Sequence, residues 1–213
     1  MNSEIQPIPK TDFPKPQKDG YTSTASFVFD IVEMVAWAVF IMIMIFSFSF
    51  RLCRVEGESM ENTLSNGQTL LIRNIGYTPK QDDIIVFHLT LPEINMEKTV
   101  VKRVIATGGQ HVEIDFNTGI IKVDGKVYED PHKTLKNSQD MPVDRYLSVP
   151  AFSPYYDFNT RIFSATVPKG SLFVMGDNRN NSNDSRNPAI GFVDERCILG
   201  KVILSLSPLK TFN

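Results

Sequence analysis

Residues 100–109 read VVKRVIATGG, and this stretch decides the predicted class of fold. β-Branched residues fill four of its first six positions and two glycines end it, which is typical of a strand that runs into a turn. Alternation along the strand places Lys102 on the face of Val100 and Val104, and Arg103 on the opposite face. Because aliphatic residues occupy both faces, the sequence predicts a buried strand with a lysine inside a β domain.

Further short runs rich in β-branched residues flank this stretch and are separated by turn-forming residues. They are TLLIRNI at 69–75, DIIVFHL at 83–89, HVEID at 111–115, GIIKVDGKVY at 119–128, SLFVMGD at 171–177 and GKVILSL at 200–206. Asp124-Gly125 is a tight hairpin signal. No run among them has a convincing helical period, so we predict a mainly β domain, an antiparallel sheet or barrel-like fold, over residues 51–213.

Residues 130–160 do not follow this pattern. They are richer in Pro, Asn, Ser and Asp than the runs around them, and they alternate poorly. Segments of this kind usually run over the surface, so we predict an excursion from the main sheet, either a small subdomain or a loop over the functional face.

The sequence ahead of the β runs predicts a single transmembrane helix. Residues 31–50, IVEMVAWAVFIMIMIFSFSF, are apolar except for Glu33 and two serines, and a helix of this length spans about 30 Å, one hydrocarbon thickness. A buried core helix is one alternative, but such a helix normally keeps a polar stripe. A cleavable signal peptide is another, but the polar stretch ahead of the span is longer than a usual n-region. We therefore predict a membrane anchor over residues 27–50.

Residues 1–26 are predicted to form a flexible tail, because prolines, lysines and polar residues dominate its first twenty positions and bury too little apolar surface to order the chain. Three lysines in this tail place it in the cytoplasm by the positive-inside rule, although Arg51 and Arg54 after the span weaken that bias. The β domain would then lie on the extracytoplasmic side of the cell membrane.

Composition excludes several classes of function. The 22 basic and 24 acidic side chains give a formal net charge of −2, which excludes a strongly basic nucleic-acid binder. Cys53 and Cys197 are too few for a disulfide framework and lack the paired spacing of a zinc site. The histidines, His88, His111 and His132, are scattered, so neither a metal nor an organic cofactor is expected. The chemistry should come from hydroxyl, amine and carboxylate side chains.

Lys102 is the first candidate catalytic residue. Burial disfavours an ammonium and lowers the pKa of a lysine, and a neutral amine is a general base. Within the protein, the group that such a base could deprotonate is a serine hydroxyl, which is a poor nucleophile until a base takes its proton. Ser59, in GESMENTL at 57–64, is the candidate. Because no histidine lies in these segments, a serine–lysine dyad is favoured over a serine–histidine–carboxylate triad.

Three segments carry a resemblance to a known family. GESMENTL at 57–64, VVKRVIATGG at 100–109 and GDNRNNSNDSR at 176–186 follow one another behind the apolar span, and together they resemble bacterial type I signal peptidases. The resemblance covers nearly all of the chain from the span to Lys201. It implies a membrane-bound serine endopeptidase that cleaves signal peptides from exported pre-proteins after a small-x-small motif. The implied partners are secretory pre-proteins and the lipid bilayer, with no nucleic acid.

The resemblance also implies roles for individual residues. Ser59 matches the family's nucleophile and Lys102 its general base. Ser182 matches a hydroxyl that orients the lysine, while Asp184 and Arg186 match a charged pair that braces the loops of the site.

Gly57 stands where some family members carry a hydroxyl that donates to the oxyanion. The resemblance implies one oxyanion donor, the backbone N–H of Ser59, and leaves the other to backbone or water. The positions that match the family's shallow substrate pocket are Val55, Met60, Leu64, Val100 and Val101.

The chain departs from the family's pattern in three loops. Asn62 replaces a proline before Thr63, residues 106–110 replace a Gly-x-Pro-Gly-Asp sequence, and Asp82-Asp83 replaces a Gly-Asp pair. Two alternatives therefore stay open. One is a non-catalytic, membrane-anchored β domain that binds exported polypeptides. The other is a self-cleaving serine–lysine regulator, although such proteins usually carry a DNA-binding domain.

Overall fold

The structure, a computed structural model, describes residues 24–91, 96–129 and 154–212. It divides into two units, Met1–Ile45 and Phe46–Asn213. Most of the predicted tail and most of the predicted excursion, 130–160, lie outside the described residues.

Helix α1 runs from Thr24 to Ser49. Its side chains are exposed almost throughout, although nearly all of them from Ile31 onward are apolar. A helix with apolar residues exposed on every face needs an apolar environment. By length and composition, Ser26–Ser49 is a candidate membrane span. The helix begins three residues before the predicted anchor, and Phe50 already belongs to the first strand.

Eight strands form the sheet that carries the candidate site, and we call it the first sheet. They are β1 (Phe50–Arg54), β2 (Thr69–Arg73), β3 (Ile84–Leu91), β4 (Met96–Thr107), β10 (Ser171–Met175), β11 (Val193–Asp194), β12 (Ile198–Leu206) and β13 (Leu209–Thr211). Their order is β1-β2-β12-β3-β4-β10-β11, and β13 pairs with β12. Every pairing is antiparallel, which confirms the predicted class of fold.

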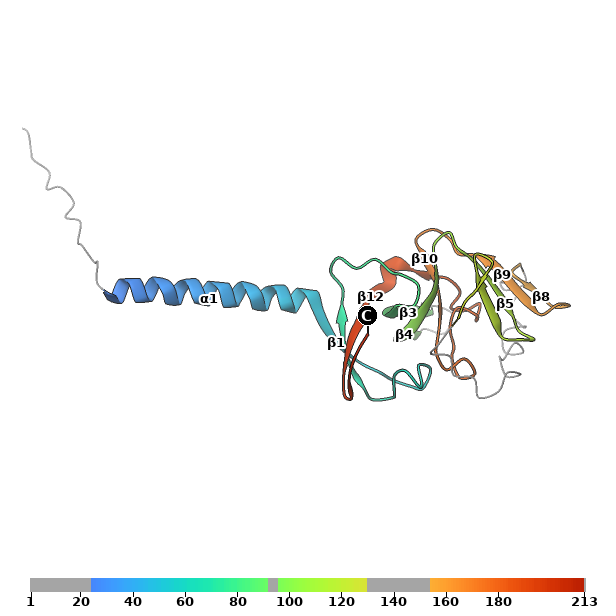
Figure 1. The fold of residues 1–213 in the computed structure, drawn as a ribbon, viewed down its shortest axis with the longest axis horizontal. Helices are drawn as coiled ribbons and strands as arrows, with labels where there is room; N and C mark the ends of the chain where they lie inside the picture. The colour runs from blue at the N-terminus through green and yellow to red at the C-terminus, as the bar shows by residue number, and fades with distance from the viewer. Residues whose placement is uncertain (1–23, 92–95, 130–153, 213) are drawn as a thin grey trace, which may run out of the picture. The chain divides into compact units, whose positions relative to one another are not determined.

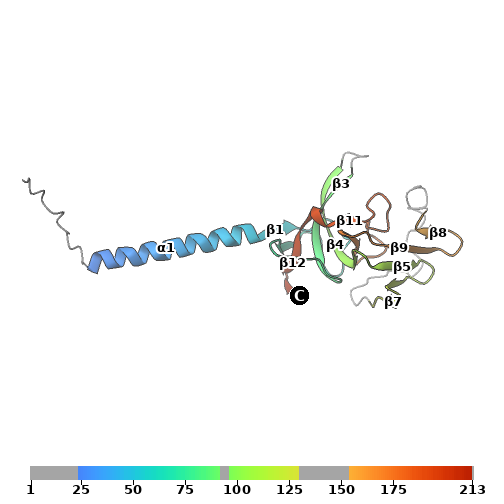
Figure 2. The same ribbon diagram turned by 90° about the horizontal axis from the view of Figure 1, so that it is seen from above.

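Five strands form a second sheet, in the order β7-β6-β5-β9-β8. They are β5 (His111–Asp115), β6 (Ile120–Val123), β7 (Lys126–Val127), β8 (Tyr156–Asp157) and β9 (Ile162–Thr166). Val123 pairs with Lys126, and Asp124 and Gly125 between them both have positive φ, 51° and 77°, as a two-residue hairpin turn requires. We call the unit Phe46–Asn213 the β unit. Within it, β5, β8 and β9 lie at the end away from β1 and β12 in both Figure 1 and Figure 2.

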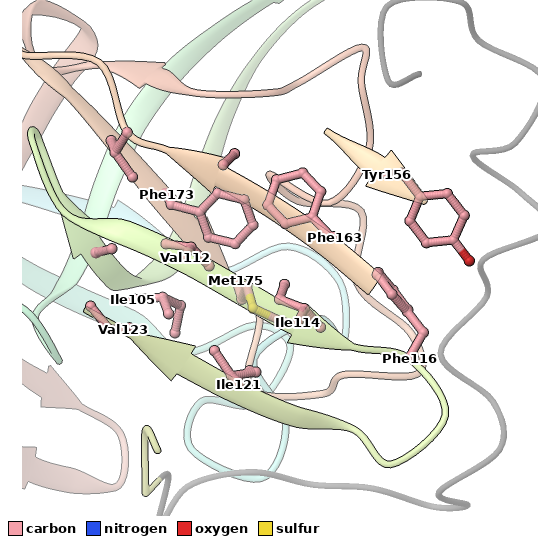
Figure 3. Close-up of a cluster of buried hydrophobic side chains, with 13 residues drawn as sticks. Ile105, Val112, Ile114, Phe116, Ile121, Val123, Tyr156, Phe163, Phe173 and Met175 are labelled. Carbon is pink, nitrogen blue, oxygen red and sulfur yellow. The ribbon is translucent and has the colours of Figure 1, made fainter. Parts of the chain in front are cut away.

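The two sheets share an apolar core, shown in Figure 3. Phe163 on β9 packs against Phe173 on β10 with ring centroids 5.5 Å apart, and Ile105 and Met175 of the first sheet join the same cluster. The cluster packs against β4 and β10, which pair with each other as antiparallel neighbours. The core therefore fixes the strand that carries Lys102 next to the strand that leads into residues 176–186.

Candidate active site

Ser59 lies in a closed loop, residues 55–68, between β1 and β2. The ends of the loop are joined because Val55 N–H donates to Gln68 O at 2.8 Å and Gly67 N–H donates to Val55 O at 2.9 Å. Met60, next to the serine, is buried and packs in a cluster with buried residues of β2, β3, β4 and β12. Ser59 is therefore held by its neighbours on a constrained turn.

Lys102 lies on β4, where it pairs with Ile85 of β3, and only 3% of it is exposed. Its Nζ lies 2.5 Å from Ser59 Oγ, within hydrogen-bond distance. The structure thus brings together the two residues that the sequence singled out, which lie on separate segments of the chain.

The surroundings of Lys102 favour its neutral form. Burial is the main cause and lowers the pKa of Lys102 from 10.5 to about 8; the Asp184 carboxylate acts in the opposite direction, and the positive charges of Arg186 and Lys98 lower the pKa further. A substantial fraction of the amine is neutral near pH 8. The amine can therefore accept a proton from a hydroxyl within its reach.

Asp184 and Arg186 form a fully buried, two-point ion pair. Arg186 Nε lies 2.7 Å from Asp184 Oδ1, and Arg186 Nη2 lies 2.8 Å from Oδ2. Burial acts to raise the pKa of Asp184, but the Arg186 charge and hydrogen bonds from Arg186, the Gly176 N–H and Ser182 hold it below its ordinary value. Arg186 also links two parts of residues 176–186, because its Nη2 donates to Arg179 O at 2.9 Å. This geometry supports the predicted bracing role.

At Gly176, residues 176–186 come very close to the loop 55–68 that carries Ser59. A methyl group on its Cα would lie 2.2 Å from Ser182 Oγ and 2.4 Å from Ser59 O, so no side chain fits there. Asn178 N–H donates to Ser59 O at 3.1 Å. Ser182 is buried and helps to hold the pKa of Asp184 below its ordinary value. The structure thus places Ser182 beside the serine loop.

A second buried ion pair, between Arg103 and Asp177, was not assigned a role from the sequence. Arg103 Nε and Nη2 donate to the two oxygens of Asp177 at 2.8 and 2.7 Å, and Nη1 donates to Asp82 O at 2.8 Å. The sequence contained a signal for this pair. An arginine on the second face of a buried strand needs a carboxylate partner, and Asp177 ends the predicted run 171–177. The pair links β4 to the start of residues 176–186.

Ser59 and Lys102 open into a cleft of about 700 Å³. The cleft is lined by residues 54–60, Asn66, Leu89, residues 98–102, Asn181, Asn183, Asn187, Ala189 and Ile190. The lining includes the predicted pocket residues Val55, Met60, Val100 and Val101. Leu64, the fifth, is fully buried in the core and is not among the residues that line this cleft.

Gly57 lies in the same cleft with φ +91°, a conformation that favours glycine. Its N–H donates to Asn66 Oδ1 at 3.1 Å. Sequence reasoning did not single out Asn66, which lies nine residues further along the loop. Its position beside Gly57 depends on the closure of the loop.

Among the described residues, no group of three or more His, Cys, Asp or Glu side chains is placed to hold a metal ion. Cys53 and Cys197 are free thiols. The lining of the cleft includes the Lys102 amine and the Ser59 hydroxyl, which are a general base and a nucleophile of the kind that acyl transfer uses.

The chain is similar to several known proteins. The family model for signal peptidase, peptidase S26, matches residues 28–207. Signal peptidase IB of Staphylococcus aureus is 34% identical over 164 residues, which cover 75% of this chain and 78% of the relative. A probable signal peptidase I-1 of Synechocystis sp. is 32% identical over 161 residues, covering 72% and 69%. A solved signal peptidase I from Enterococcus faecalis is 28% identical, with a TM-score of 0.37, and the match covers 59% of this chain and 97% of that one.

Proposed function

Since this chain belongs to the signal peptidase family, peptidase S26, we propose that it is a membrane-anchored endopeptidase in which Ser59 is the nucleophile and Lys102 the general base. Its substrates are exported pre-proteins, from which it removes the signal peptide. The observation that carries this proposal is the buried amine of Lys102, 2.5 Å from the Ser59 hydroxyl, at the floor of an open cleft.

The reaction proceeds by acyl transfer. Ser59 Oγ adds to the carbonyl carbon of the scissile bond while its proton passes to Lys102 Nζ, and the carbonyl electron pair moves onto the oxygen. The tetrahedral intermediate then collapses, the peptide C–N bond breaks, and the proton on Lys102 goes to the leaving amine. In the second half, Lys102 takes a proton from a water molecule, whose oxygen adds to the ester carbonyl. The C–Oγ bond then breaks, Lys102 returns the proton to Ser59 Oγ, and the new carboxyl end of the product leaves.

Preference for small side chains follows from the apolar lining of the cleft. Val55, Met60, Val100 and Val101 line it next to the dyad, and we propose that they form the floor against which the substrate residues before the scissile bond pack. A pocket of this kind rejects large side chains by steric overlap, which costs more than the loss of a methylene. Cleavage after a small-x-small motif is the specificity that this floor would produce.

Helix α1 supports the proposed location. We place the tail in the cytoplasm, Ser26–Ser49 across the cell membrane, and the β unit on the extracytoplasmic side. A substrate whose own hydrophobic segment lies in the same bilayer is confined with the enzyme, which raises its effective concentration at the cleft.

Cleavage of a purified pre-protein by the full-length chain in detergent micelles tests the dyad. Ser59→Ala and Lys102→Ala should each lower kcat by about 10³-fold or more, and the double variant should be little worse than either, because the two residues act as a unit. Ser65→Ala, an exposed serine of the same loop, and Lys126→Ala on β7 are matched controls that should keep wild-type rates.

Near-wild-type cleavage by either dyad variant would end the assignment. Binding of pre-proteins without turnover by the wild-type chain would instead support the non-catalytic alternative. A single internal cut in the purified chain without added substrate would support the self-cleaving one.

A further inference from the structure

The proposed reaction leaves one interaction unassigned. When Ser59 Oγ adds to the substrate carbonyl, negative charge develops on the carbonyl oxygen, and serine hydrolases stabilise it with preorganised N–H or O–H donors. The backbone N–H of Ser59 can serve as one donor. Gly57, two residues earlier, has no side chain that could donate. The side chain at position 57 therefore supplies no second donor, and the assignment of one to another residue rests on the proposed function.

Asn66 reaches this part of the cleft from the other end of the loop. Gly57 N–H donates to its Oδ1 at 3.1 Å, and Asn66, Gly57 and Ser59 all line the cleft. Because a backbone N–H can only donate, the amide atom that faces Gly57 is the carbonyl oxygen. The −NH₂ half, with two donor hydrogens, therefore points elsewhere. Within the described residues, Nδ2 makes no hydrogen bond.

The backbone around Asn66 is held in place before substrate arrives. Ser65 N–H donates to Gln68 Oε1 at 3.1 Å, Gln68 N–H donates to Ser65 O at 3.3 Å, and Gly67 N–H donates to Val55 O at 2.9 Å. The space next to Gly57 is also open, because a methyl group there would have no atom within 4 Å. A substrate can therefore approach Gly57 from the part of the cleft that the exposed Asn66 side chain also lines.

We propose that Asn66 is a catalytic residue whose Nδ2 donates the second hydrogen bond to the oxyanion. As the Oγ–C bond forms and the proton moves to Lys102 Nζ, the charge on the substrate oxygen grows and the bond from Nδ2 strengthens. The amide keeps both of its protons throughout. An asparagine side chain is a recognised donor for this purpose, and loss of one such donor lowers kcat by about 10²–10³-fold.

Asn66→Asp is the sharpest variant. It keeps an oxygen that accepts from the Gly57 N–H, but it replaces the donor with an acceptor and a negative charge. We expect kcat of the full-length chain in micelles to fall by about 10²–10³-fold with KM within about threefold, because the interaction forms only in the transition state. Asn74→Asp makes the same change at an exposed position in the turn after β2, outside the cleft lining, and should leave kcat unchanged.

A peptide boronate separates a catalytic role from a structural one. The boronate adds to Ser59 Oγ and forms a tetrahedral adduct whose oxygen occupies the oxyanion position. Its affinity for Asn66→Asp should fall by about the same factor as kcat/KM, while the midpoint of thermal unfolding stays near that of Asn74→Asp. A fall in kcat with unchanged boronate affinity would overturn the proposal.

Two further outcomes separate this proposal from the proposed function. If the wild-type chain cleaves pre-protein, Ser59→Ala does not, and Asn66→Asp keeps kcat within about threefold, then the role of Asn66 alone is refuted. If the wild-type chain does not cleave at all while it binds pre-protein, the proposed function fails, and the role of Asn66 with it.

Discussion

The two sheets of the β unit bury different kinds of side chain. The first sheet and the segment after β10 enclose charged groups, Lys102 and the ion pairs Arg103–Asp177 and Arg186–Asp184. The buried residues of the second sheet are apolar, and its cross-strand ion pair, Lys122–Glu113, lies at the surface with the two side chains 41% and 34% exposed.

The difference shows where the fold accepts an energetic cost. Burying a charge costs several kcal/mol unless a well-placed partner compensates it, whereas burying aliphatic and aromatic side chains is favourable. The second sheet behaves as a packing element whose core, through Phe163 and Phe173, supports β10 of the first sheet. The first sheet carries the buried charges because the proposed chemistry needs a desolvated amine and rigid loops.

The largest contrast should come from removing one partner of an ion pair in each sheet. Asp184→Asn leaves Arg186 buried with an uncompensated charge, so the free energy of unfolding should fall by about 3–5 kcal/mol. Glu113→Gln breaks the exposed pair with Lys122 and should leave the free energy of unfolding almost unchanged. Chemical denaturation of the full-length chain in micelles measures both. Equal losses of unfolding free energy in Asp184→Asn and Glu113→Gln would mean that burial does not make the Asp184–Arg186 pair more important for stability than the Glu113–Lys122 pair.

The pH dependence of stability should identify the buried amine. Between pH 8 and 10.5, Lys102 is neutral in the folded chain but still protonated in the unfolded chain. The unfolded state therefore binds more protons, and the free energy of unfolding rises with pH across this window, by about 3 kcal/mol from this residue. Below pH 8, Lys102 is protonated in both the folded and the unfolded chain, so the cost of burying its charge lowers the free energy of unfolding in full.

Lys102→Met should remove that contribution, whereas Lys122→Met, in the second sheet, should not. The measurement is the difference in denaturation free energy between each variant and the wild type at several pH values. A Lys102→Met curve parallel to that of the wild type would show that the amine is not desolvated. In the active chain, cleavage should rise as pH increases through about 8, since the neutral amine is the base.

The smallest effect concerns Lys98, which lines the cleft on the same strand as Lys102. Its positive charge lowers the pKa of Lys102, so Lys98→Gln should raise it. The acidic limb of the pH–rate profile should then move to higher pH by a few tenths of a unit, because water screens charges across an open cleft. Lys126→Gln, on β7, should leave the profile in place. A shift to lower pH for Lys98→Gln would contradict the electrostatic assignment.

Much of the first sheet could be predicted from the sequence because its strands carry strong local signals. The runs around residues 69–75, 83–89, 100–109 and 200–206 all form strands. The short edge strands β8, β11 and β13 were not predicted, since two or three residues carry no periodicity. Strand β9 was also missed, because Ser164 and the small residues around it weaken the apolar signal although Phe163 and Ala165 are buried.

The candidate site also combines residues that could be predicted from the sequence with contacts that could not. Ser59 and Lys102 were predictable as a pair because a buried lysine and a serine in a family-like motif both have few other uses. Their catalytic roles stay predictions until cleavage is measured. The contact of Gly176 with Ser182 and Ser59, the partner of Arg103 and the position of Asn66 beside Gly57 all depend on where loops close in space. Sequence spacing carries no information on such contacts.

Local periodicity and side-chain type were enough to predict the apolar helix, the antiparallel β class, the hairpin at Asp124-Gly125 and the residues able to carry the chemistry. Three features became visible in the folded chain alone: β12 lies between β2 and β3, Lys102 Nζ reaches Ser59 Oγ, and Asn66 lies in the same cleft. These contacts join residues distant in sequence, and the packing of the whole core, rather than any one segment, sets their distances.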